Sequence, residues 1–144
     1  MSSVASVVSP PGGKRALPIL HTPRFIVAPL KPAEVRDLVR VLLQDERLAA
    51  QLPWMREKTL DGVAQEAFLL EMQCAAGTVE VWGIVERART MLVGAALARH
   101  ALGGIDIEIL CASQLWDQGV ADEVFEPVAE WLEAAIDIQI GLPQ

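Results

Sequence analysis

Apolar and polar positions recur along this chain with two periods, one typical of helices and one typical of strands. The points at which one period gives way to the other mark the boundaries of its predicted elements. A short apolar run over residues 25–30 predicts a strand, and Pro32 suits the first turn of a following helix. One apolar face then recurs at helical spacing, through Val35, Leu38, Val39, Leu42 and Leu43. We expect this helical region to end at Pro53.

A second helix is predicted between Thr59, which can cap its N-terminus, and Gly77, which stops it. Three strand-like runs follow, separated by a charged turn and by a pair of glycines: residues 79–85, 91–97 and 105–111. Helices followed by a three-strand meander predict one mixed α/β domain of the α+β type, with a mostly antiparallel sheet flanked by helices.

After Gly119 the pattern predicts another helix, with Val124 and Val128 on its buried stripe. Pro127 lies inside this helix, and proline removes a helical hydrogen bond. We therefore expect either a kink near residues 123–126 or a second helical piece that begins at Pro127.

The last residues predict one more strand, because Ile136, Ile138 and Ile140 alternate with polar residues. Exposed strand edges pair readily, so the chain is expected to form a homodimer through this C-terminal edge, near residues 136–142. We assign residues 1–21 to a flexible N-terminal tail and residues 22–144 to the folded domain.

Composition narrows the classes of function. The 144 residues are 52% apolar and carry a net charge of −7, with a pI near 4.8. This acidity argues against a nucleic-acid partner, which needs clustered Lys and Arg, and mildly favours cationic amine substrates. No apolar run reaches the roughly 18 residues that span a membrane, and no export signal is evident, so we expect no membrane association and a cytoplasmic location.

The cysteines and histidines suggest no metal site or disulfide. Cys74 and Cys111 lie in apolar settings without a second Cys or His at ligand spacing, which favours buried thiols. His21 and His100 stand outside any motif and are interpreted as ordinary surface or hydrogen-bonded residues.

The segment from Glu108 to Glu123 carries the most chemistry. A β-prone run with one acid leads through a glycine-containing turn into a helix, and helix N-termini bind anions through unpaired N–H groups. An ordinary strand-to-helix connection has the same pattern.

The chain resembles the GNAT N-acetyltransferases, and within them the RimJ/RimL-like branch. The octet from Trp116 to Glu123 is similar to the branch's W-G-x-G-x-A-x-E pyrophosphate loop, and Glu108-Ile109 to its E-I-G-Y strand. Residues 22–30 resemble its opening T-E-R-L-x-L-R-P-L, and Leu52-Pro53-Trp54 its L-P-W segment. The likeness runs from about Thr22 to Ile140.

This resemblance implies the acyl-CoA N-acyltransferase fold and acetyl-CoA as co-substrate, with no metal. It implies direct acetyl transfer to a primary amine, either a protein N-terminus or a small amine. Glu108 is the candidate general base, with Asp106 as a rival on the same face, and Trp54 the candidate acceptor-site residue. The candidate cofactor-binding residues are Leu110, Cys111, Ala112, Trp116, Asp117, Gln118, Gly119, Val120 and Ala121, with N–H groups near Leu110 to Ala112 polarising the thioester.

The chain departs from the family in two respects. Family members continue with another helix and two strands, so we interpret the chain as C-terminally short, either a fragment or a reduced member. Glu108 and Trp116 are eight positions apart rather than about ten, which shortens the segment that would pair with the pantetheine arm. A degenerate protein that binds CoA or a protein partner without turnover is therefore the alternative function.

Overall fold

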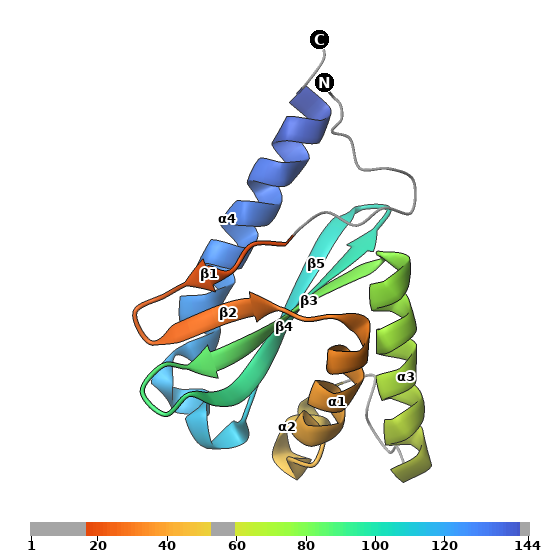
Figure 1. Ribbon diagram of the computed structural model, residues 1–144, viewed down its shortest axis with the longest axis vertical. Coiled ribbons are helices and arrows are strands. Elements are labelled where there is room, and N and C mark those ends of the chain that lie inside the picture. The colour runs from red at the N-terminus through yellow and green to blue at the C-terminus, as the bar shows by residue number, and fades with distance from the viewer. Residues whose placement is uncertain (1–16, 53–59, 142–144) are drawn as a thin grey trace.

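The computed structural model describes residues 17–52 and 60–141. A five-stranded sheet lies at its centre, with strand order β1-β2-β3-β4-β5 and every neighbouring pair antiparallel (Figure 1). Its strands are β1 (Leu20–His21), β2 (Phe25–Pro29), β3 (Val79–Glu86), β4 (Met91–Ala101) and β5 (Gly104–Cys111). The antiparallel sheet and four of its strands are thus as predicted. The sheet starts earlier than expected, because Leu20 and His21, assigned above to the tail, pair with β2.

The helices are α1 (Pro32–Leu42), α2 (Glu46–Gln51), α3 (Leu60–Ala76) and α4 (Val120–Gly141). Pro32 occupies the first turn of α1, as predicted. Gly77, with φ of 84°, follows α3 in the left-handed region where glycine commonly ends helices. The predicted cap Thr59 lies outside the described residues.

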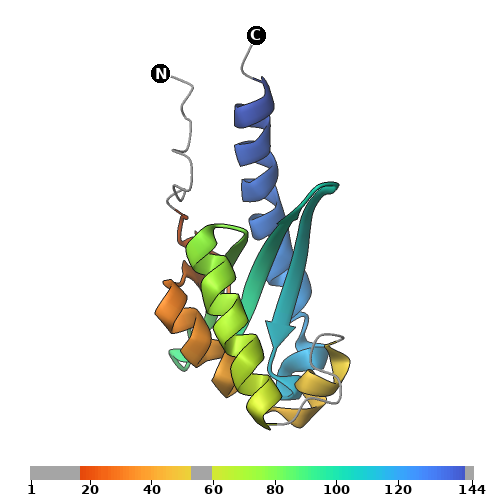
Figure 2. The same ribbon diagram turned by 90° about the vertical axis from the view of Figure 1, so that its right-hand side faces the viewer.

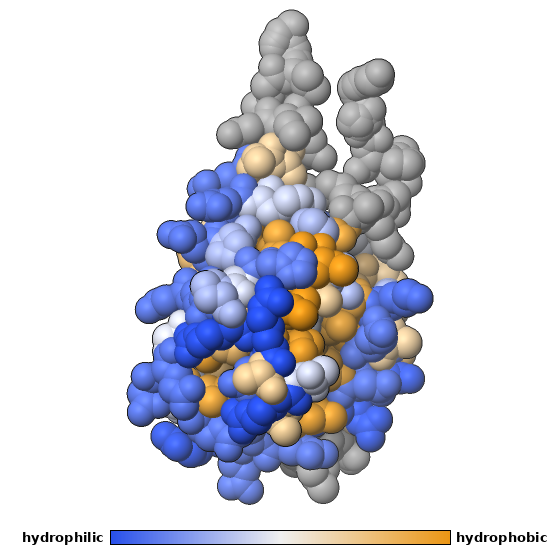
Figure 3. Space-filling view, turned by 60° about the vertical axis from the view of Figure 1, so that its left-hand side comes forward, coloured by the Kyte–Doolittle hydropathy of each residue, from blue (hydrophilic) through white to orange (hydrophobic). Residues whose placement is uncertain are grey.

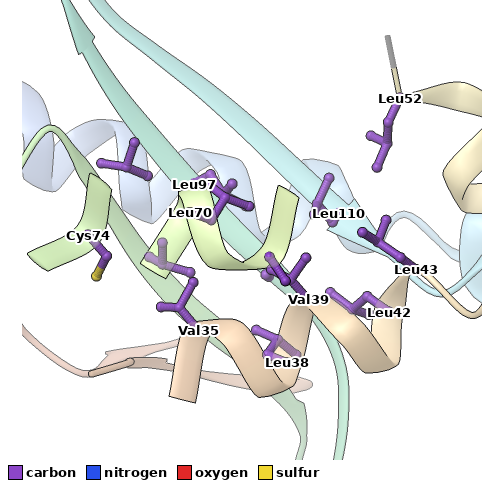
Figure 4. Packing of buried hydrophobic residues seen from close by; sticks show 14 of the residues in the cluster. Val35, Leu38, Val39, Leu42, Leu43, Leu52, Leu70, Cys74, Leu97 and Leu110 are labelled. Carbon is purple, nitrogen blue, oxygen red and sulfur yellow. The ribbon is translucent and has the colours of Figure 1, made fainter. Parts of the chain in front are cut away.

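Helices α1 and α3 cover one face of the sheet, and α4 covers the other (Figures 1 and 2). On the first face, Val35, Val39 and Leu70 pack with Leu97 and Leu110 of the strands (Figure 4). Alternation along each strand sends the next residues to the opposite face. The two faces therefore have separate apolar cores.

The core on the α4 face is built around Trp82, which is fully buried. Its ring meets that of Trp131 edge to face, with centroids 5.9 Å apart, and its Nε1 donates to the Pro18 carbonyl at 3.1 Å. Some apolar surface stays uncovered: orange side chains lie between hydrophilic ones on the side of the molecule shown in Figure 3, and Ile19 and Leu92 are among the exposed large residues.

The predicted strand over residues 136–140 is wrong, because α4 runs from Val120 to Gly141 without a break. Each residue added to an existing helix gains a backbone hydrogen bond, whereas a new strand needs a free edge beside it. The strand edge invoked for a homodimer is consequently absent from the described part of the chain. A separate helical piece starting at Pro127 is also wrong, and the kink stays a prediction.

Within residues 17–52 and 60–141, no helix has both the length and the apolar character required to cross a bilayer.

Candidate functional site

The turn after β5 consists of a short 3-10 helix, one glycine and the start of α4. The 3-10 helix spans Ser113–Gln118, and Gly119 follows with φ of 73°, a conformation that glycine adopts without strain. Val120 begins α4 and is buried beneath the sheet, which anchors the helix N-terminus. The chain thus leaves the 3-10 helix and enters α4 with an abrupt change of direction at Gly119.

The predicted phosphate-binding residues fall into two groups. Trp116, Asp117 and Gln118 lie in the 3-10 helix, whose N–H groups bond carbonyls three residues back. Val120 and Ala121 begin α4, where the first N–H groups have no partner within the helix. The most favourable place for an anion is therefore at the N–H groups of Gly119 to Ala121, at the positive end of the 22-residue helix α4.

Two acids follow directly in the first turn of α4, Asp122 and Glu123. Acids stabilise a helix at this position but repel a bound anion. Glu123 is held by Arg24, whose Nε donates to Glu123 Oε1 at 2.6 Å and whose backbone N–H donates to Oε2 at 2.9 Å. Burial by itself raises the pKa of Glu123, but hydrogen bonds from Thr22 and Arg24 outweigh it and lower the pKa below its ordinary value.

Strand β5 has one paired side and one open side in the described sheet. Ala112 N–H donates to the Val93 carbonyl at 2.9 Å, and alternate residues of an antiparallel ladder face the same neighbour. Leu110 and Glu108 consequently direct their backbone groups towards β4, at Ala95 and Leu97. The backbone groups of Cys111, and of residues 105, 107 and 109, face the open side. Of the three residues predicted to polarise a thioester, Cys111 alone presents its N–H there.

Trp116 closes the end of this open side. Its Nε1 donates to the Cys111 carbonyl at 2.8 Å, and its side chain remains 39% exposed. The guanidinium of Arg47, from α2, lies 5.1 Å from the centre of the Trp116 ring, within cation–π distance. The turn therefore has a basic group on its exposed surface.

A second contact joins the turn to the other face of the molecule. Asp45, the N-cap of α2, accepts from Ser113 N–H at 2.7 Å and from the Ser113 hydroxyl at 3.0 Å. Burial raises the pKa of Asp45, but hydrogen bonds from Ser113 and from Leu48 N–H outweigh it, and the pKa lies below its ordinary value. The start of the turn and the start of α2 are fixed together.

Glu108 lies on the face covered by α1 and α3, because it pairs in register with Leu97 and lies two positions from Leu110, and both leucines are buried on that face. Its Oε1 accepts from Arg99 Nη1 at 2.6 Å, and both side chains are about a quarter exposed. Asp106, the rival base, lies on the same face and is exposed. The ion pair with Arg99 fixes the position of the Glu108 carboxylate and occupies its Oε1.

The other candidate residues add little to this site. Trp54 lies outside the described residues. His21 contacts Arg87, with ring Nδ1 3.1 Å from Nη2, and His100 Nε2 lies 2.9 Å from Glu80 Oε1.

Both cysteines are buried free thiols. Burial, and then the charge of Asp45, raise the pKa of Cys111 to about 11, so this side chain is neutral at physiological pH. The described residues contain no group of three His, Cys, Asp or Glu side chains that could hold a metal ion.

Comparison with known proteins identifies the family. The model of the acetyltransferase (GNAT) domain matches residues 24–140, most of the chain. The chain belongs to the GNAT acetyltransferase family. No curated protein matches it significantly.

Solved structures of GNAT proteins share the fold. The “Putative GnaT-family acetyltransferase from Bordetella pertussis” has a TM-score of 0.57 and 16% identity, over 88% of this chain and 75% of that one. A “putative ribosomal-protein-serine acetyltransferase from Vibrio cholerae” has a TM-score of 0.58 and 15% identity, over 83% and 69%. The “Ribosomal-protein-S5-alanine Acetyltransferase from Vibrio fischeri” has a TM-score of 0.60 and 12% identity, over 84% and 70%.

GNAT membership implies acetyl-CoA as co-substrate, and two features of this chain fit that molecule. The open side of β5 offers backbone groups to the amide-containing arm, and the N-terminus of α4 offers N–H groups to the phosphates. The acids Asp122 and Glu123 oppose the second feature, and Arg24 offsets one of them.

Arg24 and Glu123 were not among the functional residues proposed from sequence, although both lie in the quoted motifs. Arg24 is the arginine of the opening segment, and Glu123 is the last residue of the loop motif. The signal available in the sequence was that one motif contains a positively charged residue and the other a negatively charged one, which could form a pair. Their contact across 99 positions becomes evident only when the chain folds.

Proposed function

We propose that this chain is an acetyl-CoA-dependent N-acetyltransferase of the RimJ/RimL-like branch, which transfers the acetyl group directly to a primary amine. The observation that carries the proposal is that the open side of β5 ends at Cys111, where the turn leads at once into the N-terminus of α4. One extended ligand can pair with the strand edge and place its phosphates at Gly119 to Ala121. Because the Vibrio neighbours are described as ribosomal-protein acetyltransferases, a protein N-terminus is the first acceptor to test.

The proposed reaction has two stages. The amine attacks the thioester carbonyl, and the oxyanion that forms accepts a hydrogen bond from Cys111 N–H. The intermediate then collapses, which breaks the carbon–sulfur bond and releases CoA as a thiolate that takes up a proton. Glu108 accepts the proton lost by the amine, and a proton then leaves Glu108 to solvent.

The geometry favours a water between Glu108 and the amine. Glu108 lies three residues before Cys111, about 10 Å along an extended strand. A carboxylate covers that span more readily through one ordered water than by direct contact. The exposed Asp106, two positions from Glu108, adds negative charge on the same face, in keeping with the net charge of −7 and with a cationic amine as substrate.

The test is acetyl transfer by the purified chain. Acetyl-CoA is incubated with peptides that begin with alanine or serine and with small amines, and the released thiol is followed with a thiol reagent. The same peptides with blocked N-termini are the matched controls, and CoA binding is measured in parallel by calorimetry. Thiol release with peptides that have free N-termini, and none with the blocked peptides, supports the proposal. Absence of CoA binding contradicts it.

A second candidate is a protein that binds CoA without turnover. The contact between Glu108 and Arg99, at 2.6 Å, favours it, because Arg99 already occupies the Oε1 atom that would otherwise be open to the amine or to a bridging water. Micromolar CoA binding without thiol release for any acceptor in the panel would select this second function over the first.

A further inference from the structure

We propose that Arg24 is a positioning residue for the phosphate-binding turn: it fixes the peptide group between Gln118 and Gly119 and offsets the charge of Glu123. The proposal rests on the proposed use of CoA. Arg24 belongs to the loop between β1 and β2, on the far side of the sheet from the edge strand β5.

Three polar contacts fasten Arg24 to the turn. Its Nη2 donates to the Gln118 carbonyl at 2.7 Å, and its Nε and backbone N–H both donate to the Glu123 carboxylate. One guanidinium thus contacts the residue before Gly119 and the residue four after it. Charge-assisted hydrogen bonds are stronger than neutral ones, and the planar guanidinium fixes the directions of both its bonds.

The contact with Gln118 sets the direction of the next N–H group. In a trans peptide the carbonyl and the following N–H point in opposite directions, and no cis peptide is present in the described residues. Because the Gln118 carbonyl points to Arg24, the N–H of Gly119 points away from Arg24. A rotated peptide would instead present a carbonyl oxygen to the phosphate, which repels it.

The contact with Glu123 removes an electrostatic obstacle. A carboxylate one turn from a helix N-terminus stabilises the helix but competes with an anion for the same positive potential. Arg24 pairs with this carboxylate at 2.6 Å, and the two side chains are 43% and 17% exposed respectively. The turn therefore keeps an acid that stabilises α4, and the charge of that acid is offset by Arg24.

The experiment compares Arg24→Met, which removes the charge and both side-chain donors, with Arg24→Lys, which keeps the charge alone. Arg89→Met is the matched control, because Arg89 forms a similar exposed pair with Glu86 at 2.7 Å. Two quantities are measured: the Kd for CoA by calorimetry, and the amide hydrogen exchange of residues 113–122 in the ligand-free protein.

We expect Arg24→Met to raise the Kd for CoA about tenfold or more and to accelerate exchange across residues 113–122. Arg24→Lys should fall between it and the wild type, because one ammonium group cannot hold both acceptors in the geometry of a fork. Arg89→Met should change neither quantity. Glu123→Gln should not raise the Kd for CoA, since Arg24 retains its bond to Gln118 and one acid near the phosphates is removed.

The outcomes separate this inference from the proposed function. Wild-type binding of CoA with an unchanged Kd in Arg24→Met would overturn the role of Arg24 and leave the use of CoA standing. Failure of the wild type to bind CoA would overturn the proposed use of CoA. Unchanged hydrogen exchange in Arg24→Met would, by itself, refute the claim that Arg24 orients the turn. If Arg24→Met does not fold, a wild-type Kd and wild-type exchange in Arg24→Lys overturn the proposal.

Discussion

Replacement of Gly119 tests where the phosphates bind, and the structure separates two effects of that change. Gly119 has φ of 73°, so any side chain there carries backbone strain of about 1 kcal/mol. Neighbouring atoms add little, because among the described residues a Cβ at Gly119 would come within 4 Å of Arg24 Nη2 alone, at 3.9 Å. Asn and Asp tolerate this conformation best among the other residues and differ in charge alone. The pair Gly119→Asp and Gly119→Asn therefore isolates the electrostatic effect.

The expected size follows from Coulomb's law. Two like unit charges about 5 Å apart repel by about 3 kcal/mol at an effective dielectric constant of about 20, and by under about 1 kcal/mol in bulk water. Gly119 is exposed, so the true value lies between these limits. We expect Gly119→Asp to bind CoA about ten- to a hundredfold more weakly than Gly119→Asn.

The assay is calorimetric titration of each variant with CoA at about 50 and 300 mM salt. Screening predicts a smaller difference between the two variants at the higher salt concentration. Thermal unfolding of both variants checks that they lose stability equally, by a few degrees. Equal CoA affinities for the Asp and Asn variants would refute phosphate binding at Gly119, whatever their common difference from the wild type.

Three further predictions follow from other parts of the structure. Glu108→Gln should leave the Kd for CoA unchanged and slow thiol release about a hundredfold, and normal turnover would remove the base assignment. Folding lowers the pKa values of Asp45 and Glu123, so the stability that these carboxylates contribute is present above their unfolded-state pKa values and is lost as pH falls through their folded-state pKa values. The Tm of the wild type should therefore drop below about pH 4. The drop should be less steep in Asp45→Asn, which lacks one of the two carboxylates. Leu97→Ala, in the core, should lower the free energy of unfolding measured in urea by about 2–5 kcal/mol. Leu102→Ala, at a fully exposed position, should lower it by less than about 0.5 kcal/mol, and equal losses in the two variants would contradict the assigned core.

The strands were predictable because each carries its own local pattern. Residues 79–85 and 105–111 are apolar, β-prone and bounded by turn residues, and neither needs its neighbour to be recognised. The ends of α1 and α3 were equally local, since Pro32 and Gly77 act through their own backbone conformations. Pattern was misleading at residues 136–140, where alternating isoleucines continue a helix.

The candidate site was only partly predictable. Gly119 and the helix that follows it could be read from a short segment, as could the position of Glu108 on its strand. The sequence could not show which backbone groups of β5 face the open side, because that depends on the register between β5 and β4. Trp116 illustrates the same limit: its motif suggested a cofactor-binding residue, and the fold directs its Nε1 to the Cys111 carbonyl.

Sequence by itself determined four of the five strands and the ends of α1 and α3, the family to which the chain belongs, and the glycine at which its candidate phosphate-binding turn is built. These properties depend on residues within a few positions of one another, where propensity and periodicity act. Tertiary structure alone decided that Arg24 meets Glu123, that Arg99 holds Glu108 and that Asp45 caps the start of the turn at Ser113. Such contacts have no local signature, because charged side chains find their partners only after the two apolar faces of the sheet have been buried.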